Sequence, residues 1–181
     1  ILVGLVGSEM CIRDRAAAGQ DPDWLVDRYA YMMRESIKDR PADMTIGMHM
    51  CRGNFMSTHA AEGSYHAVAD AVFNKTGVDV FFMEYDTERA GDLAPLGELS
   101  KGSQRVMLGF ITTKSGELET MDHLKRQYEK ASNFADMEQL GIAPQCGFAS
   151  TEEGNSITVD DQRRKLCLLY TSDAADELSR G

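Results

Sequence analysis

Two kinds of apolar pattern alternate along the chain. Apolar residues at helical spacing follow Asp21-Pro22-Asp23, a helix start with an N-cap and a proline in the first turn, and this helix closes at Arg40-Pro41. Short continuous apolar runs predict four strands, at 44–48, 78–85, 105–111 and 140–144.

Further helices are predicted between and after these strands. One runs from Ser64 to Gly77, one carries an apolar face from Leu118 to Ala131, and the last begins at Thr158 or Asp160. Strands that alternate with helices are typical of parallel α/β folds. Continuous apolar strands, as opposed to alternating ones, predict a sheet that is covered on both faces.

Composition narrows the class of protein. The 181 residues include 43% hydrophobic and 27% charged residues, as in a soluble globular domain. The formal net charge of −10 argues against nucleic acid or an anionic membrane as the partner, and no apolar run approaches the roughly 18 to 20 residues of a membrane span. The four cysteines are widely and irregularly spaced, which favours a reducing, cytoplasmic location over a disulfide framework.

The two ends differ in character from the rest. Residues 1–15 and 167–181 resemble translated sequencing adapters, so we interpret them as artefactual extensions of a natural segment at 16–166. The alternative is an ordinary strand and an ordinary amphipathic helix. Cys11 and Cys167 are therefore given no functional role.

Candidate chemistry lies at the ends of the predicted strands. His49 and Cys51 are two residues apart, so in a strand they point to the same face, while Glu84, Lys114 and Cys146 each follow or end another strand. The carboxyl ends of parallel strands form the edge where α/β proteins build their sites. Imidazole, thiolate and carboxylate are zinc ligands, and His49, Cys51, Glu84 and Cys146 make a tetrahedral set.

Other interpretations of these residues stay open. The cysteines can be buried small apolar residues and His49 a core histidine. Glu84 can form an ion pair with Arg52 or Arg89.

Three motifs together resemble a known family. They are His49-Met50-Cys51-Arg52-Gly53-Asn54, Phe81-Phe82-Met83-Glu84-Tyr85-Asp86 and Pro144-Gln145-Cys146-Gly147-Phe148. In this order they resemble the C-terminal catalytic domain of cobalamin-independent methionine synthase, and more closely its shorter, methionine-synthase-like relatives. The resemblance implies zinc (Zn2+) held by His49, Cys51, Glu84 and Cys146. It also implies that residues 16–166 are the C-terminal half, about strands five to eight, of a (β/α)8 TIM-type barrel.

The activity implied is methyl transfer from 5-methyltetrahydrofolate (polyglutamate) to the thiolate of homocysteine at the zinc, giving methionine. The half-barrel alone is expected to be inactive. The chain departs from the long enzymes at Thr112-Thr113-Lys114-Ser115, where they have Asp-x-His-Ser with a histidine proposed as proton donor. Lys114 is the candidate catalytic residue at this place, where it can donate a proton or hold an anionic group, although an equivalent role does not follow from its position. A solvated lysine is the alternative.

Three more residues are predicted to lie near the substrates. Arg52 and Asn54 follow the first ligands and can contact a substrate carboxylate or the methyl donor, or else only brace their loop. Asp86 lies two residues beyond Glu84, on the same side. Two other functions remain possible, a non-catalytic zinc- or thiol-binding barrel domain and a metal-free, decarboxylase-like barrel fragment.

Overall fold

The computed structural model describes residues 14–50, 52–59, 61–149 and 151–179. Its strands are β1 (Gly47–Met50), β2 (Val80–Glu84), β3 (Arg105–Ile111) and β4 (Leu140–Pro144). Its α-helices are α2 (Pro22–Ile37), α3 (Met121–Ala131) and α4 (Val159–Ser179), with a π-helical turn η2 (Ala71–Lys75) and short 3-10 turns η3 (Glu88–Ala90), η4 (Ala94–Glu98) and η5 (Met137–Gln139).

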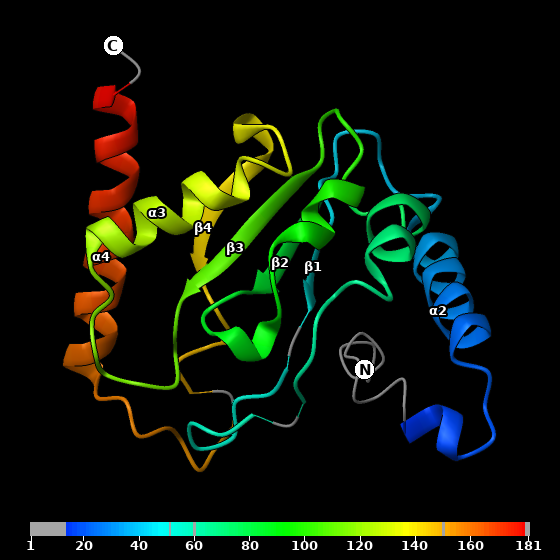
Figure 1. Ribbon diagram of the computed structural model, residues 1–181, viewed down its shortest axis with the longest axis horizontal. Coiled ribbons are helices and arrows are strands. Elements are labelled where there is room, and N and C mark those ends of the chain that lie inside the picture. Colours follow the sequence, from blue (N-terminus) through cyan, green and yellow to red (C-terminus); the bar gives the residue numbers. More distant parts are fainter. Residues whose placement is uncertain (1–13, 51, 60, 150, 180–181) are drawn as a thin grey trace.

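The four strands form one parallel sheet in the order β1-β2-β3-β4, as predicted for an α/β fold (Figure 1). β3 and β4 begin and end at the predicted residues. β1 starts at Gly47, not at residue 44, because the Asp79 carboxylate accepts the Ile46 N–H and the Met44 N–H closes a turn on Pro41. The chain therefore reaches the ladder three residues later than its apolar pattern indicates.

Local capping explains where the helices begin. The Asp21 carboxylate accepts the N–H groups of Asp23 and Trp24, which confirms the predicted start of α2. The predicted helix start at Thr158 is also confirmed, since its hydroxyl accepts the Asp161 N–H one turn into α4.

Two other helices are shorter than predicted. Thr120 caps α3, so Leu118 lies outside the helix and is 43% exposed. The helix predicted from Ser64 is reduced to helical residues 69–75, because the Ser64 hydroxyl bonds the His66 N–H in a local turn and Gly63 pairs with the Arg89 carbonyl.

The hydrophobic core lies on one face of the sheet. Met48, Phe81 and Leu108 point to this face and are buried against side chains of α2, η2 and α3. On the opposite face Phe82 is 39% exposed and His49 is exposed. Among the described residues the prediction of a sheet covered on both faces is therefore wrong, because no helix packs over His49 and Phe82.

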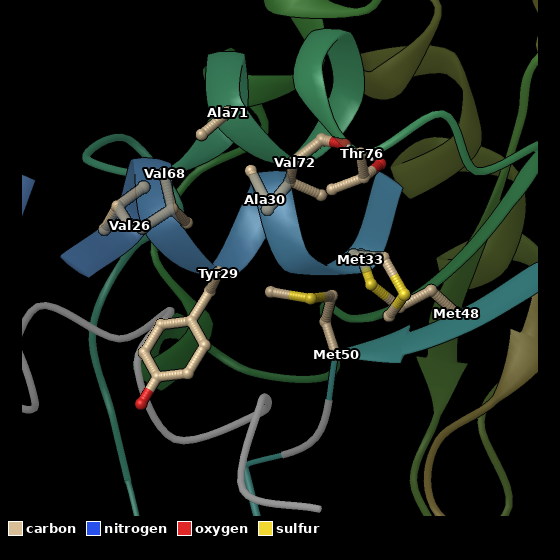
Figure 2. A pocket seen from close by; sticks show the side chains of 10 residues that line it. All are labelled: Val26, Tyr29, Ala30, Met33, Met48, Met50, Val68, Ala71, Val72 and Thr76. Atoms are coloured by element: carbon tan, nitrogen blue, oxygen red, sulfur yellow. Dashed lines mark hydrogen bonds between the residues drawn. The ribbon is translucent and has the colours of Figure 1, made fainter. Parts of the chain in front are cut away.

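A small apolar cavity of about 40 Å³ lies between α2, η2 and β1. Figure 2 shows the side chains of Met48 and Met50 turned toward α2 there. Since neighbouring strand residues point to opposite faces, His49 between them points away from this cavity. None of the helices in the described ranges has the length and apolar content needed to cross a membrane.

Candidate metal centre

Three of the four predicted ligands converge. His49 Nε2 lies 3.4 Å from Cys146 Sγ, and Cys146 Sγ lies 3.0 Å from Glu84 Oε1. One ligand atom from each residue falls within 4.8 Å of the other two. Glu84 is fully buried and Cys146 is buried, whereas His49 is exposed. Cys51, the fourth predicted ligand, lies outside the described residues.

The parallel sheet explains this convergence. His49 lies on β1, Glu84 is the last residue of β2, and Cys146 follows β4 by two residues. Their side chains therefore meet at the carboxyl edge of the sheet, although 97 residues separate the first from the last. The site depends on tertiary structure alone, because no two of these three residues are neighbours in the chain.

Cations surround the Glu84 carboxylate at a distance. Lys114 Nζ lies 3.5 Å from Oε1 and Arg89 Nη2 lies 3.8 Å from Oε2. Oε2 is buried and accepts no hydrogen bond from any described residue. Of the two ion pairs considered as alternatives for Glu84, the one with Arg89 is present but long. Arg52 bonds the backbone carbonyl of Glu84 and not its carboxylate.

Lys114 faces the centre. Its side chain is 11% exposed, and Nζ donates to Gln145 Oε1 at 2.9 Å while it lies near Glu84. The Gln145 amide nitrogen in turn lies 3.5 Å from the Gly109 carbonyl, in the neighbouring strand. The lysine is thus held between the ends of β2 and β4, beside the candidate metal ligands.

Arg52 and Asn54 are both buried and mainly bond backbone carbonyls. The Arg52 guanidinium donates to the carbonyls of Glu84 and Gly63, at 3.3 and 2.5 Å, while its Nε has no partner among the described residues. Asn54 Nδ2 donates to the Thr113 hydroxyl at 3.1 Å and to the Gly147 carbonyl at 3.2 Å, and Asn54 Oδ1 is unpartnered within the same ranges. Both side chains brace loops at the carboxyl edge and leave one polar atom each for another group.

Asp86 belongs to the same electrostatic group. Arg89 Nη2 lies 3.3 Å from Asp86 Oδ1 and so bridges Asp86 and Glu84. Between them lies Tyr85, where burial raises the pKa of the phenol above its usual range. That hydroxyl has no partner in the described part of the chain, and Tyr85 packs in the hydrophobic core between the two acidic residues in sequence.

Sequence reasoning missed Tyr65 and Gln145. The Tyr65 hydroxyl accepts the Glu84 N–H and donates to the Met50 carbonyl, at the ends of the two strands that carry His49 and Glu84. Gln145 adjoins Cys146 and could have been considered on that ground. Tyr65 lies in the first turn of the helix predicted from Ser64 to Gly77, and nothing in its local pattern connects it with a strand 19 residues away.

The fold and the site define a class of protein, a parallel α/β domain with an imidazole, a thiol and a carboxylate gathered at the carboxyl edge of its sheet. Within that class, the family model described as "Cobalamin-independent synthase, Catalytic domain" matches residues 24–161. The chain belongs to this family, which confirms the resemblance of its three motifs.

Two curated relatives come from Bacillus subtilis (strain 168). The uncharacterized protein YxjG is 45% identical over 159 residues, which are 88% of this chain and 42% of that protein. The uncharacterized protein YxjH is 45% identical over 164 residues, 91% of this chain and 43% of that protein. The chain thus spans about two fifths of the length of these relatives.

Two solved structures have a similar fold. The putative vitamin-B12 independent methionine synthase of Listeria monocytogenes matches with a TM-score of 0.64 and 37% identity, over 84% of this chain and 42% of that one. A B12-independent methionine synthase from Shewanella sp. W3-18-1 matches with a TM-score of 0.60 over 89% of this chain and 57% of that one. Its 15% identity supports the likeness of fold alone.

Proposed function

We propose that this chain is part of a zinc-dependent methyltransferase that methylates the thiolate of homocysteine with a methyl-folate donor. The observation that carries this proposal is the convergence of His49, Glu84 and Cys146, with one ligand atom of each within 4.8 Å of the others. Membership in the cobalamin-independent synthase family supports the reaction class.

The residues at the centre fit a zinc ion. They supply one nitrogen, one sulfur and one carboxylate, the donor types that zinc takes in proteins. The buried Glu84 Oε2, which no described group hydrogen-bonds, also fits a ligand that awaits a cation. His49, Glu84 and Cys146 would hold the metal, with Cys51 as the fourth ligand. Zinc, when bound, lowers the pKa of a coordinated thiol and so stabilises a thiolate at neutral pH.

The chain's own residues would bind the substrates and move the proton. Lys114 carries three N–H donors beside Glu84 and Gln145, and we assign it the transfer of a proton to the methyl donor, whose leaving amine must be neutralised. The unpartnered Asn54 Oδ1 and Arg52 Nε, with Asp86 nearby, are assigned to the polar groups of the substrates.

We further propose that the sheet is half of a (β/α)8 barrel, its strands five to eight. β1 and β4 are the two edges of the sheet, three strand spacings apart, which is about 14 Å in a flat sheet. An imidazole on β1 and a thiol just after β4 could not approach to 3.4 Å across a flat sheet, so strong curvature supports the barrel. The chain's share of its relatives' length supports it too, because it leaves room for the other strands.

A second candidate is a metal-free fragment with the same fold. Lys114 and Arg89 favour it, because two cations beside Glu84 balance part of its charge without a metal.

Zinc stoichiometry separates the two candidates. The purified chain should hold one zinc per molecule by elemental analysis, and competition with a chromophoric chelator should give its affinity. Cys146→Ser and Glu84→Gln should each weaken zinc binding at least tenfold, because each removes a ligand. Cys167→Ser is the matched control, since Cys167 is exposed on α4 and should leave the affinity unchanged.

A chain with no stoichiometric zinc would overturn the zinc site and favour the metal-free fragment. The transfer itself is then measured in a full-length family member, with homocysteine and 5-methyltetrahydrofolate, by mass spectrometry of methionine. A zinc-loaded family member that makes no methionine would show that the site binds metal or thiol without methyl transfer.

A further inference from the structure

The Lys114 ammonium lies closer to an amide than to a carboxylate. Lys114 Nζ is 2.9 Å from Gln145 Oε1 and 3.5 Å from Glu84 Oε1. A hydrogen bond between an ammonium and a carboxylate is usually about 2.7 to 2.9 Å long. The lysine therefore bonds the neutral side chain and stays beyond hydrogen-bond distance of the charged one.

The Gln145 side chain has a fixed orientation. Gln145 directly follows β4, is 9% exposed, and donates its backbone N–H to the Ile111 carbonyl at 3.1 Å. Its Oε1 also accepts the Thr112 hydroxyl at 3.3 Å, while its Nε2 lies 3.5 Å from the Gly109 carbonyl. Because an ammonium can only donate, the amide must present its oxygen to Lys114.

Gly109 leaves room for this side chain next to Glu84. The register of β2 and β3 pairs Glu84 with Gly109. A Cβ added to Gly109 would lie 3.4 Å from Gln145 Cγ and 3.3 Å from Glu84 Cα. Gln145 thus packs against a strand position without a side chain, and its amide oxygen reaches Lys114 beside the Glu84 carboxylate.

The hydroxyl that shares the Gln145 oxygen is anchored by a buried ion pair. The Thr112 N–H donates to Glu119 Oε1 at 2.9 Å, and Lys165 Nζ lies 3.1 and 3.0 Å from the two Glu119 oxygens. The Lys165 side chain is fully buried. Thr112 Oγ1 also accepts the Lys114 N–H at 3.2 Å, so the backbone and the ammonium of Lys114 are tied to one set of contacts.

We propose that Gln145 is a positioning residue that holds the Lys114 ammonium away from Glu84 and so keeps this carboxylate available to the metal. Cys146 Sγ lies 3.0 Å from the same Glu84 oxygen that Lys114 approaches, so an ammonium that closed on it would compete with a metal ion between these two ligands. This inference rests on the proposed function, since it assigns Gln145 to the same centre.

The test is a double-mutant cycle on the zinc affinity of the full chain, measured by competition with a chromophoric chelator. Gln145→Met keeps the length of the side chain and removes the acceptor, so the ammonium should close on Glu84 to about 2.8 Å. From a start at 3.5 Å and with an effective dielectric constant of about 20, this movement strengthens the ion pair about sevenfold. We expect zinc affinity to be about 5- to 10-fold weaker than that of the unsubstituted chain.

The second arm of the cycle removes the lysine. Lys114→Met should bind zinc more tightly than the unsubstituted chain, because no ammonium then competes for Glu84. Gln145→Met added to Lys114→Met should change the affinity less than twofold. An equal loss with and without Lys114 overturns the inference, because Gln145 would then act independently of the lysine. A folded Gln145→Met chain that binds zinc within twofold of the unsubstituted chain also overturns it and leaves the proposed function intact.

Gln139→Met is the matched control. Gln139 is a buried glutamine that directly precedes β4, and its amide donates to the carbonyls of Ser100 and Gln104. Thermal melting should show similar losses of stability for both glutamine variants, while only Gln145→Met should lose zinc affinity. If Gln145→Met does not fold, Gln145→Asn takes its place in the cycle, since it keeps the amide and withdraws the oxygen by one methylene.

A crystal structure of metal-free Gln145→Met tests the inference without zinc. Lys114 Nζ should lie within about 3.0 Å of a Glu84 carboxylate oxygen. A separation unchanged from 3.5 Å overturns the inference. If the unsubstituted chain binds no zinc, the proposed function fails, and this distance alone decides whether Gln145 holds Lys114 away from Glu84.

Discussion

Arg52 is predicted to stabilise the carboxyl edge of the sheet as strongly as a core residue. The residue is 2% exposed, and its guanidinium donates to the carbonyls of Glu84 and Gly63 and packs on the Tyr65 ring. Arg52→Ala would take this charged donor away from the carbonyls of Glu84 and Gly63 and remove a buried cation–π contact.

The size of the effect follows from these contacts. A hydrogen bond to a charged group contributes about 1.5 kcal/mol at the low end of its range, and a desolvated cation–π contact about 2 kcal/mol. Their sum is reduced because the unfolded chain regains the hydration of the guanidinium. We expect Arg52→Ala to lower the free energy of unfolding by about 3 kcal/mol, or Tm by about 6 to 12 °C for a chain of this length.

Urea unfolding followed by far-ultraviolet circular dichroism measures this loss. The free energy of unfolding of Arg52→Lys should lie between those of the unsubstituted chain and Arg52→Ala. An ammonium keeps the charge but not the planar fork that reaches separate carbonyls. Arg105→Ala is the control, since Arg105 is exposed and bonds only the Ser103 carbonyl, and it should change stability by no more than about 0.5 kcal/mol. A loss below about 1 kcal/mol for Arg52→Ala would refute the reasoning.

Two further predictions concern the start and the centre of the sheet. Burial favours the neutral form of Asp79, but the Arg40 guanidinium and a backbone N–H hold the pKa of this carboxyl below its ordinary value. The stabilising contribution of Asp79 is therefore present above about pH 4 and is lost as pH falls through the lowered pKa. Between about pH 5 and 3, the free energy of unfolding measured with urea should fall more steeply for the unsubstituted chain than for Asp79→Asn. An equal dependence on pH for the two chains would contradict this. At Gly109 an added Cβ would lie 2.7 Å from the Met83 carbonyl oxygen, so Gly109→Ala should cost about 1 to 3 kcal/mol in the same assay. Gly97→Ala, where a Cβ meets nothing within 4 Å, should cost far less, and an equal cost at both positions would show that the close approach is not the cause.

Most of the fold is predictable because each strand is marked by the same local signal, a short continuous run of apolar residues. The apolar runs at 105–111 and 140–144 give β3 and β4 to the residue. At the start of β1 the prediction fails, because the Asp79 carboxylate takes the Ile46 N–H, a contact between residues 33 positions apart. The covering of both faces was predicted wrongly for a related reason, since apolar composition does not show which strand face another element covers.

The candidate centre was predictable to a similar degree. His49, Glu84 and Cys146 could be grouped because the ends of parallel strands meet at one edge. Tyr65 could not be grouped with them, since the contacts of its hydroxyl with the Met50 carbonyl and the Glu84 N–H depend on the register of β1 and β2. A candidate metal ligand can be recognised in the sequence by its residue type. A residue that holds such a ligand in place can be recognised only from its contacts in the three-dimensional structure.

The arrangement around Glu84 is better explained by binding than by stability. A fully buried carboxylate with cations no closer than 3.5 Å, and with one oxygen unbonded by any described group, loses its hydration without full compensation. The fold nevertheless holds this carboxylate in place, because Tyr65 and Arg52 bond both of its backbone polar groups. Stability alone would favour an apolar residue at the position of Glu84. Side chains that fix the backbone of such a destabilising residue are therefore expected where the position of its carboxylate serves a ligand. The incompletely compensated desolvation of this carboxylate makes Glu84 the first place in the described chain to look for a bound cation.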